Sequence, residues 1–145
     1  MTSASAGAVA LRQAVLEAEH AAIYAYGVLG ARLDLTSRRQ ALAAFNAHRA
    51  RRDALASALR AEGAAVPGPA GGYDVAVAAR GEALALAIRV EEGVGVRWRD
   101  LVGGTDDPGL RTLAVAGLTE TAVRAARWRA LLGTTPPTVA LPGTA

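Results

Sequence analysis

Two glutamates of this chain lie in apolar stretches of helical sequence, and an aromatic residue follows each of them by seven positions. Glu19 precedes Tyr26, and Glu91 repeats the arrangement with Trp98. Residues seven apart share one face of a helix. A charge on a buried face is costly unless it is paired or binds a metal. The two carboxylates therefore predict either a ligand site or a cluster of buried ion pairs.

The helical period places further polar residues on the inward faces of the other segments. They are one histidine, one glutamate and two arginines: His48, Glu120, Arg52 and Arg127. Carboxylate oxygens with an imidazole nitrogen suit Fe, Mn or Zn, whereas the planar guanidinium of arginine suits carboxylates. The candidate metal ligands are accordingly Glu19, His48, Glu91 and Glu120. The candidate ion-pair partners are Arg52 and Arg127, and Tyr26 and Trp98 are the aromatics expected near the site.

The elements that position these residues are predicted to be helices, because the chain is rich in alanine and leucine and has few β-branched runs. Four helices are expected, at about 8–34, 38–62, 75–101 and 107–132, followed by an extended tail at 134–145. Thr36 or Ser37 is expected to cap the second helix, and Asp106 or Asp107 the fourth, with Pro108 in its first turn.

The connections predict the topology. Short turns join the first two helices and the last two, whereas the segment 64–72 is long and is broken by Pro67 and Pro69. Two antiparallel hairpins joined by one long crossover are the ferritin-like arrangement of a four-helix bundle. We expect residues 1–145 to form this single domain.

The two halves also look duplicated. Setting Glu19 on Glu91 places Tyr26 on Trp98. In the second helix of each hairpin, the run beginning at His48 aligns with the run beginning at Val123, or with a register shifted by one residue. The duplication predicts that the glutamates of the two hairpins face each other near the bundle centre.

Composition excludes several kinds of site. The chain has no cysteine, which excludes disulfides, thiolate metal sites and a cysteine nucleophile. All 16 basic residues are arginine, but they are scattered among 13 acidic residues with a net charge of only +3, so we expect no dedicated nucleic-acid surface. The first residues lack the features of a signal peptide, and no segment is apolar enough to span a bilayer. A cytoplasmic protein without membrane contact is the expectation.

The segment AEHAAIYAYGVLGARL resembles the first helix of ferritin-like proteins, including bacterioferritins and rubrerythrins, in which a metal-ligating glutamate is followed seven residues later by tyrosine. Together with AHRARRDAL and VRAARWRALLG, it resembles more closely an uncharacterised bacterial ferritin-like family of unknown function. The superfamily pattern implied by this resemblance is a glutamate from each of two helices and Glu-x-x-His from each of the other two.

This resemblance matches only part of the ligand set. Glu19 and Glu91 match the two single glutamates, His48 matches the histidine of the first pair, and Glu120 matches the glutamate of the second. Phe45 and Val123 stand at the two remaining positions. Four of six ligands remain, which implies a degenerate di-iron site.

Three interpretations of these residues are open. The four remaining ligands bind one Fe, Mn or Zn ion; or no metal binds and Arg52 and Arg127 pair with the glutamates; or the helix register turns the charges to the surface. We favour the second, a non-catalytic bundle stabilised by buried Glu, Arg and His pairs, because arginines are supplied where ligands are lost. The alternatives are an iron- or manganese-binding oxidase or iron-handling protein, and an arginine-mediated adaptor for RNA or an acidic protein. We also expect a homodimer, because alanine-rich helices pack closely.

Overall fold

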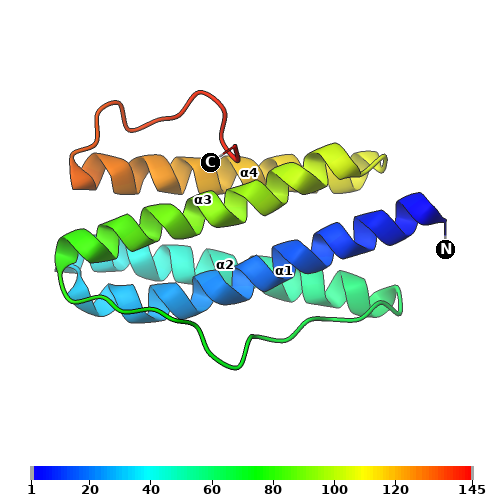
Figure 1. Ribbon diagram of the computed structural model, residues 1–145, viewed down its shortest axis with the longest axis horizontal. Coiled ribbons are helices and arrows are strands. Elements are labelled where there is room, and N and C mark those ends of the chain that lie inside the picture. Colours follow the sequence, from blue (N-terminus) through cyan, green and yellow to red (C-terminus); the bar gives the residue numbers. More distant parts are fainter. Residues whose placement is uncertain (1, 145) are drawn as a thin grey trace.

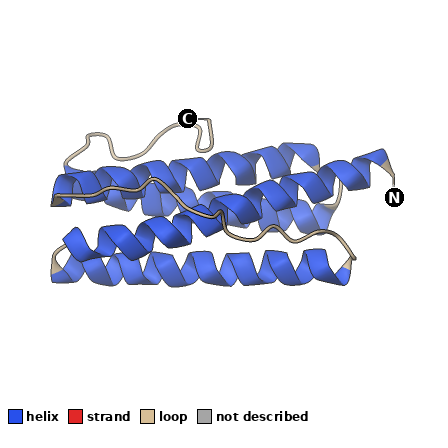
Figure 2. Ribbon diagram, turned by 60° about the horizontal axis from the view of Figure 1, so that its bottom comes forward, coloured by secondary structure: helices blue, strands red, loops and turns tan. Residues whose placement is uncertain are grey.

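The computed structural model describes residues 2–144, and the regular structure of these residues is entirely helical (Figure 2). Its elements in chain order are α1 (Ser3–Leu29), the short 3-10 helix η1 (Gly30–Arg32), α2 (Leu35–Ala61), α3 (Arg80–Gly104) and α4 (Pro108–Leu132). None of the helices within residues 2–144 is both long and apolar enough to cross a membrane.

The four helices run side by side as two antiparallel hairpins, α1 with α2 and α3 with α4 (Figure 1). The crossover, residues 62–79, returns along the whole length of the bundle, so that α2 and α3 point in the same direction (Figure 1). Helix α1 also packs against α3, which joins the two hairpins. The predicted all-α four-helix bundle is therefore confirmed.

Side-chain caps precede α1, α2 and α4, and three helix starts differ from the expectation. Helix α1 begins at Ser3 rather than near residue 8, and the starts of α2 and α3 also shift. Helix α2 begins at Leu35, because Asp34 rather than Thr36 or Ser37 is its cap, with Oδ1 accepting a hydrogen bond from Ser37 N at 2.9 Å. The cap of α4 is Asp107, which accepts from Leu110 N at 2.6 Å. Each cap satisfies a backbone N–H that the helix leaves free.

Helix α3 begins at Arg80 rather than near residue 75, because the crossover stays extended along α1. Backbone carbonyls of the crossover contact side chains of α1 and η1, in the same order along the chain. Gln13 Nε2 donates to the carbonyl of Ala65 at 2.9 Å, His20 Nε2 lies 3.0 Å from that of Pro67, and Arg32 Nε donates to that of Val77 at 3.1 Å. These contacts fix the crossover against the bundle and give His20 a structural partner.

The core consists of two apolar halves with a polar layer between them. One half includes Leu16, Leu55, Leu59, Val94, Trp98 and Leu101, and the other includes Leu29, Leu33, Ala44, Leu84, Ala87 and Trp128. The buried charged residues Glu19, His48 and Glu91 lie along α1, α2 and α3 at the junction of the two halves. The polar layer therefore sits at mid-length of the bundle.

Gly117 on α4 lets the ring of Trp98 lie directly against the helix backbone. A Cβ at this position would approach Trp98 Cδ2 to 2.4 Å, a clash with a ring that is itself 1% exposed. We expect Gly117→Ala to lower the free energy of unfolding by about 1–3 kcal/mol through overpacking. Urea unfolding of the variant and the natural protein measures this difference in the free energy of unfolding.

Gly93→Ala is the matched control for this substitution, because a Cβ at Gly93 on α3 meets nothing within 4 Å. Alanine favours the helix over glycine by up to about 1 kcal/mol, so this variant should be slightly more stable than the natural protein. Equal effects of the two substitutions would contradict the packing of Trp98 on Gly117.

Candidate functional site

Glu19, His48 and Glu91 form a continuous hydrogen-bonded chain across the bundle. His48 lies between the two carboxylates, with Nδ1 2.5 Å from Glu19 Oε2 and Nε2 3.1 Å from Glu91 Oε1. All three residues are at most 1% exposed. The structure thus brings together three of the four predicted metal-ligand candidates.

The imidazole of His48 carries a positive charge in this arrangement. An ionised carboxylate only accepts hydrogen bonds, so both ring nitrogens must donate, which requires the imidazolium form. Burial alone would lower the pKa of His48, but the hydrogen bonds to Glu19 and Glu91 raise it from 6.5 to about 9. His48 is therefore protonated at neutral pH.

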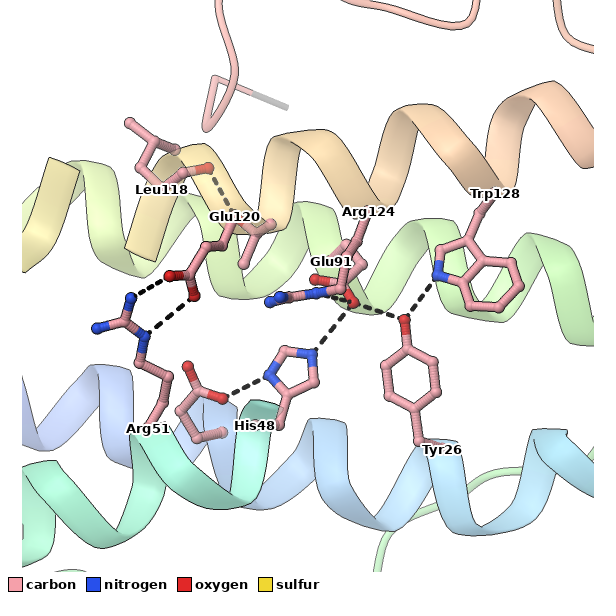
Figure 3. A network of polar contacts seen from close by, with 10 residues as sticks. Tyr26, His48, Arg51, Glu91, Leu118, Glu120, Arg124 and Trp128 are labelled. Atoms are coloured by element: carbon pink, nitrogen blue, oxygen red, sulfur yellow. Dashed lines mark hydrogen bonds and ion pairs between the residues drawn. The ribbon is translucent and has the colours of Figure 1, made fainter. Parts of the chain in front are cut away.

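Arg124, which the sequence analysis did not single out, and Tyr26, which it placed near the site, complete the contacts of Glu91 (Figure 3). Arg124 Nε on α4 donates to Glu91 Oε1 at 2.9 Å, and Tyr26 OH donates to the same oxygen at 2.5 Å. Trp128 Nε1 in turn donates to Tyr26 OH at 2.8 Å. We call the six residues Glu19, Tyr26, His48, Glu91, Arg124 and Trp128 the central cluster.

The surroundings of Glu91 keep it ionised despite its burial. Burial raises the pKa of this carboxyl, but the hydrogen bond and charge of His48, the charge of Arg124 and the hydrogen bond from Tyr26 together hold the pKa below its usual value of 4.5. Burial and the charge of Glu91 raise the pKa of the Tyr26 phenol well above 10, so this phenol remains a donor. The central cluster then holds two carboxylates and two cations, and its formal charges cancel.

Glu120, the fourth ligand candidate, lies outside the central cluster. Arg51 on α2 holds it, with Arg51 Nη2 2.5 Å from Glu120 Oε1 and Nε 3.2 Å from Oε2 (Figure 3). The Glu120 side chain is 44% exposed. Among residues 2–144, Trp98 makes no hydrogen bond to the central cluster. Its ring packs on Gly117, and the Arg51 guanidinium carbon lies 5.6 Å from the ring centroid.

The two arginines expected to pair with the glutamates point elsewhere. Arg52 donates to its neighbour Asp53 at 2.8 Å near the surface, and Arg127 is exposed. A neighbouring arginine makes the contact with the opposite hairpin instead. It is Arg51 on α2, which pairs with Glu120, and Arg124 on α4, which pairs with Glu91.

The reason for this difference is that small residues, not leucines, form the inner face of α4. The buried residues of α4 are Ala114, Gly117, Thr121, Ala125, Trp128 and Arg129. Arg124 is three residues after Thr121 and four before Trp128, so it lies on this stripe, whereas Glu120 and Arg127 are turned further away from it around the helix. Leu110 and Leu113 are larger but only partly buried, so taking them as the centre of the inner face assigns the wrong rotation to α4.

Within residues 2–144 no group of three or more His, Asp or Glu side chains is arranged to hold a metal ion. His48 lies between Glu19 and Glu91 and donates to both, so no ring nitrogen has a free lone pair. The nearest cation to Glu91 on the α4 side is Arg124.

Comparisons with known proteins place the chain in a family but assign no activity. A crystal structure of a conserved hypothetical protein, rv2844, from Mycobacterium tuberculosis is 34% identical and superposes with a TM-score of 0.86, covering 97% of this chain and 100% of that one. No curated protein matched the sequence. The profile of a domain of unknown function, DUF4439, matches residues 10–145. The chain therefore belongs to the DUF4439 family.

Proposed function

We propose that this protein is a ferritin-like, metal-independent helical bundle without catalytic activity, stabilised at its centre by buried ion pairs. One observation carries the proposal: Arg124 Nε donates to Glu91 at 2.9 Å, while both nitrogens of His48 are engaged by carboxylates. The cations that balance Glu19 and Glu91 thus come from the chain itself. Removing either cation would leave a buried charge, which is costly.

The register of α4 supports a ferritin-like origin of this centre. Setting Arg124 on His48 places Thr121 on Phe45. In the superfamily pattern, Arg124 then stands at the second histidine, and Phe45 and Thr121 stand at the glutamates of the two Glu-x-x-His pairs. With this register Glu120 no longer stands at a ligand position, so three rather than four of the six positions keep a ligand residue, and Arg124 occupies one of the others. A guanidinium in that position repels a metal cation and attracts the carboxylates.

Elemental analysis of untagged protein after incubation with Fe(II), Mn(II) or Zn(II), followed by desalting, tests this proposal. We expect far less than one metal ion per chain, and an unfolding midpoint unchanged by a chelator. Arg124→His is the informative comparison, because it removes the competing cation and restores an imidazole at the second histidine position.

Metal near one or two ions per chain in the natural protein, lost in Glu19→Ala, would overturn the proposal. That result would favour the iron- or manganese-handling alternative and make oxygen consumption the next assay.

Association into a homodimer and a cytoplasmic location stay predictions from the sequence. Light scattering coupled to size-exclusion chromatography measures the mass in solution, for which we expect twice the chain mass. Binding to RNA, the remaining alternative, would have to weaken steeply with salt.

A further inference from the structure

A groove of ≈ 220 Å³ lies between α2 and α4. Within residues 2–144, α1 packs closely on α2 and on α3, and α3 on α4, whereas α2 and α4 are not closely packed against each other. The α2 side of the groove consists of Gln40 and three alanines, Ala43, Ala44 and Ala47, whose short side chains leave space between the helices. Because the groove is smaller than the pockets of drug-sized ligands, it suits a small molecule.

Arg124 offers one edge of its guanidinium to this groove. Its Nε donates to Glu91 Oε1 at 2.9 Å, which fixes the plane of the group. Nη1 and Nη2 have no hydrogen-bond partner among residues 2–144, and Figure 3 shows the dashed contact of Arg124 at Nε alone. Neither nitrogen is fully enclosed, because Glu91 Oε2 is the one fully buried side-chain polar atom without a partner in that part of the chain. Since Arg124 lines the groove and its side chain is 15% exposed, both nitrogens are available to a ligand there.

The charged lining of the groove is entirely cationic. Besides Arg124 it contains Arg127, which is exposed and has no carboxylate partner among residues 2–144. None of the described Asp or Glu residues lines the groove, and the single acid of α4, Glu120, is paired with Arg51. An anion in the groove therefore meets two guanidinium groups and no opposing charge.

Charge balance indicates which anion fits. The formal charges of the central cluster cancel when Arg124 is counted with Glu19, His48 and Glu91, which leaves Arg127 as one excess positive charge. A monoanion balances this charge, whereas a dianion leaves a net negative charge close to the buried Glu91. The planar edge of a guanidinium also matches the two oxygens of a carboxylate.

We propose that this groove binds a small organic monocarboxylate, whose oxygens accept from Nη1 and Nη2 of Arg124 and from Arg127 while its apolar body lies on Ala43 and Ala47. The proposal goes beyond the proposed function and rests on it in one respect, because the ion pair with Glu91 holds Arg124 in place.

Benzoate is the probe, and benzamide and benzylammonium carry the same ring without the negative charge. The measurement is titration of the ¹⁵N-labelled 145-residue chain at constant ionic strength, followed by the backbone amide signals of Ala43, Ala47 and Arg127. Benzoate should shift these signals saturably. Benzamide and benzylammonium should bind at least about tenfold more weakly, because hydrogen bonds between charged groups are worth at least that factor. Inorganic phosphate should also bind more weakly than benzoate.

Arg127→Gln should weaken benzoate binding by about threefold or more, because it removes one of the two cations at a partly exposed site. Arg60→Gln is the matched control, since Arg60 is also exposed but lies near the end of α2 and does not line the groove. It should leave the affinity for benzoate unchanged. Ala47→Leu should abolish binding by filling the groove, with an unchanged circular dichroism spectrum showing that the bundle is retained.

Four results would each overturn the proposal: no saturable shift with benzoate, benzamide or phosphate binding as tightly as benzoate, equal losses in the two arginine variants, or binding that survives Ala47→Leu. These results differ from failure of the proposed function, which appears as metal uptake in the absence of benzoate.

Discussion

Substituting Arg124 by methionine is expected to lower the free energy of unfolding by about 3–5 kcal/mol, the usual cost of removing one partner of a buried ion pair. The Arg124 side chain is 15% exposed, and its Nε lies 2.9 Å from Oε1 of Glu91, whose side chain is fully buried. Methionine has a similar length but no charge. His48 would then be the only cation left in the cluster to balance the two carboxylates of Glu19 and Glu91. Urea unfolding followed by circular dichroism measures the change.

Arg127→Met is the matched control, because Arg127 lies on the same helix but is exposed. We expect it to change stability by no more than about 0.5 kcal/mol. The same holds for Arg52→Met, although the sequence analysis pairs both Arg52 and Arg127 with the glutamates. A similar loss in all three variants would contradict the assignment of the buried pair to Arg124.

A double variant separates charge from packing. Glu91→Gln together with Arg124→Met removes one charge of each sign and leaves the pair of Glu19 and His48 balanced. It should be more stable than Arg124→Met alone, giving a positive coupling between the two sites. Strictly additive losses would show that Arg124 acts through its aliphatic contacts.

Stability should be greatest between about pH 4.5 and pH 6.5 and should fall by about 3 kcal/mol as the pH rises to 9. The pKa of His48 rises from 6.5 to about 9 on folding, so between these values the folded protein binds a proton that the unfolded chain has released. Its contribution is fully present below pH 6.5 and is lost as the pH passes 9.

The acid side of the profile has the opposite sign. Folding lowers the pKa of Glu91 below 4.5, so its contribution is present above that pH and is lost as the pH falls through the folded value. The Asp34 cap adds to this acid loss, because its hydrogen bonds with Ser37 lower its pKa from 3.8 to about 2.

Unfolding midpoints in urea across pH 3–10 measure the profile. His20→Gln should preserve the decline above pH 6.5, because the His20 ring is hydrogen-bonded to the crossover carbonyl of Pro67 rather than to a carboxylate of the central cluster. A flat profile from pH 6 to 9, or a decline that disappears with His20, would contradict the charged state of His48.

The sequence predicts the bundle well because its signals are local. Pro67 and Pro69 mark the crossover, Asp107 and Pro108 mark the start of α4, and the stripes of α1 and α3 place Glu19 and Glu91 inward. His48 is found for the same reason. These features depend on helical period and turn chemistry within one segment.

The partners of the glutamates are harder to predict, because they depend on the rotation of α2 and α4. Leu42 suggests an inward face on α2 but is 59% exposed, while Ala41 and Ala44 are the buried positions. Small residues lie inward where helices approach closely, so ranking positions by hydrophobic size shifts the register. For this reason the sequence analysis places Arg127 and Glu120 inward. In the structure Arg124 faces Glu91, and Glu120 pairs with Arg51.

The most direct test of the ion-pair centre is the protonation state of the His48 ring. In the His20→Gln variant His48 is the only histidine, since the chain has two. Its ring ¹⁵N signals therefore need no further assignment. We predict that both ring nitrogens remain protonated at pH 7 and that the ring titrates with a pKa of about 9. A neutral ring at pH 7, with one nitrogen carrying a free lone pair, would contradict the account and leave that nitrogen available to a metal.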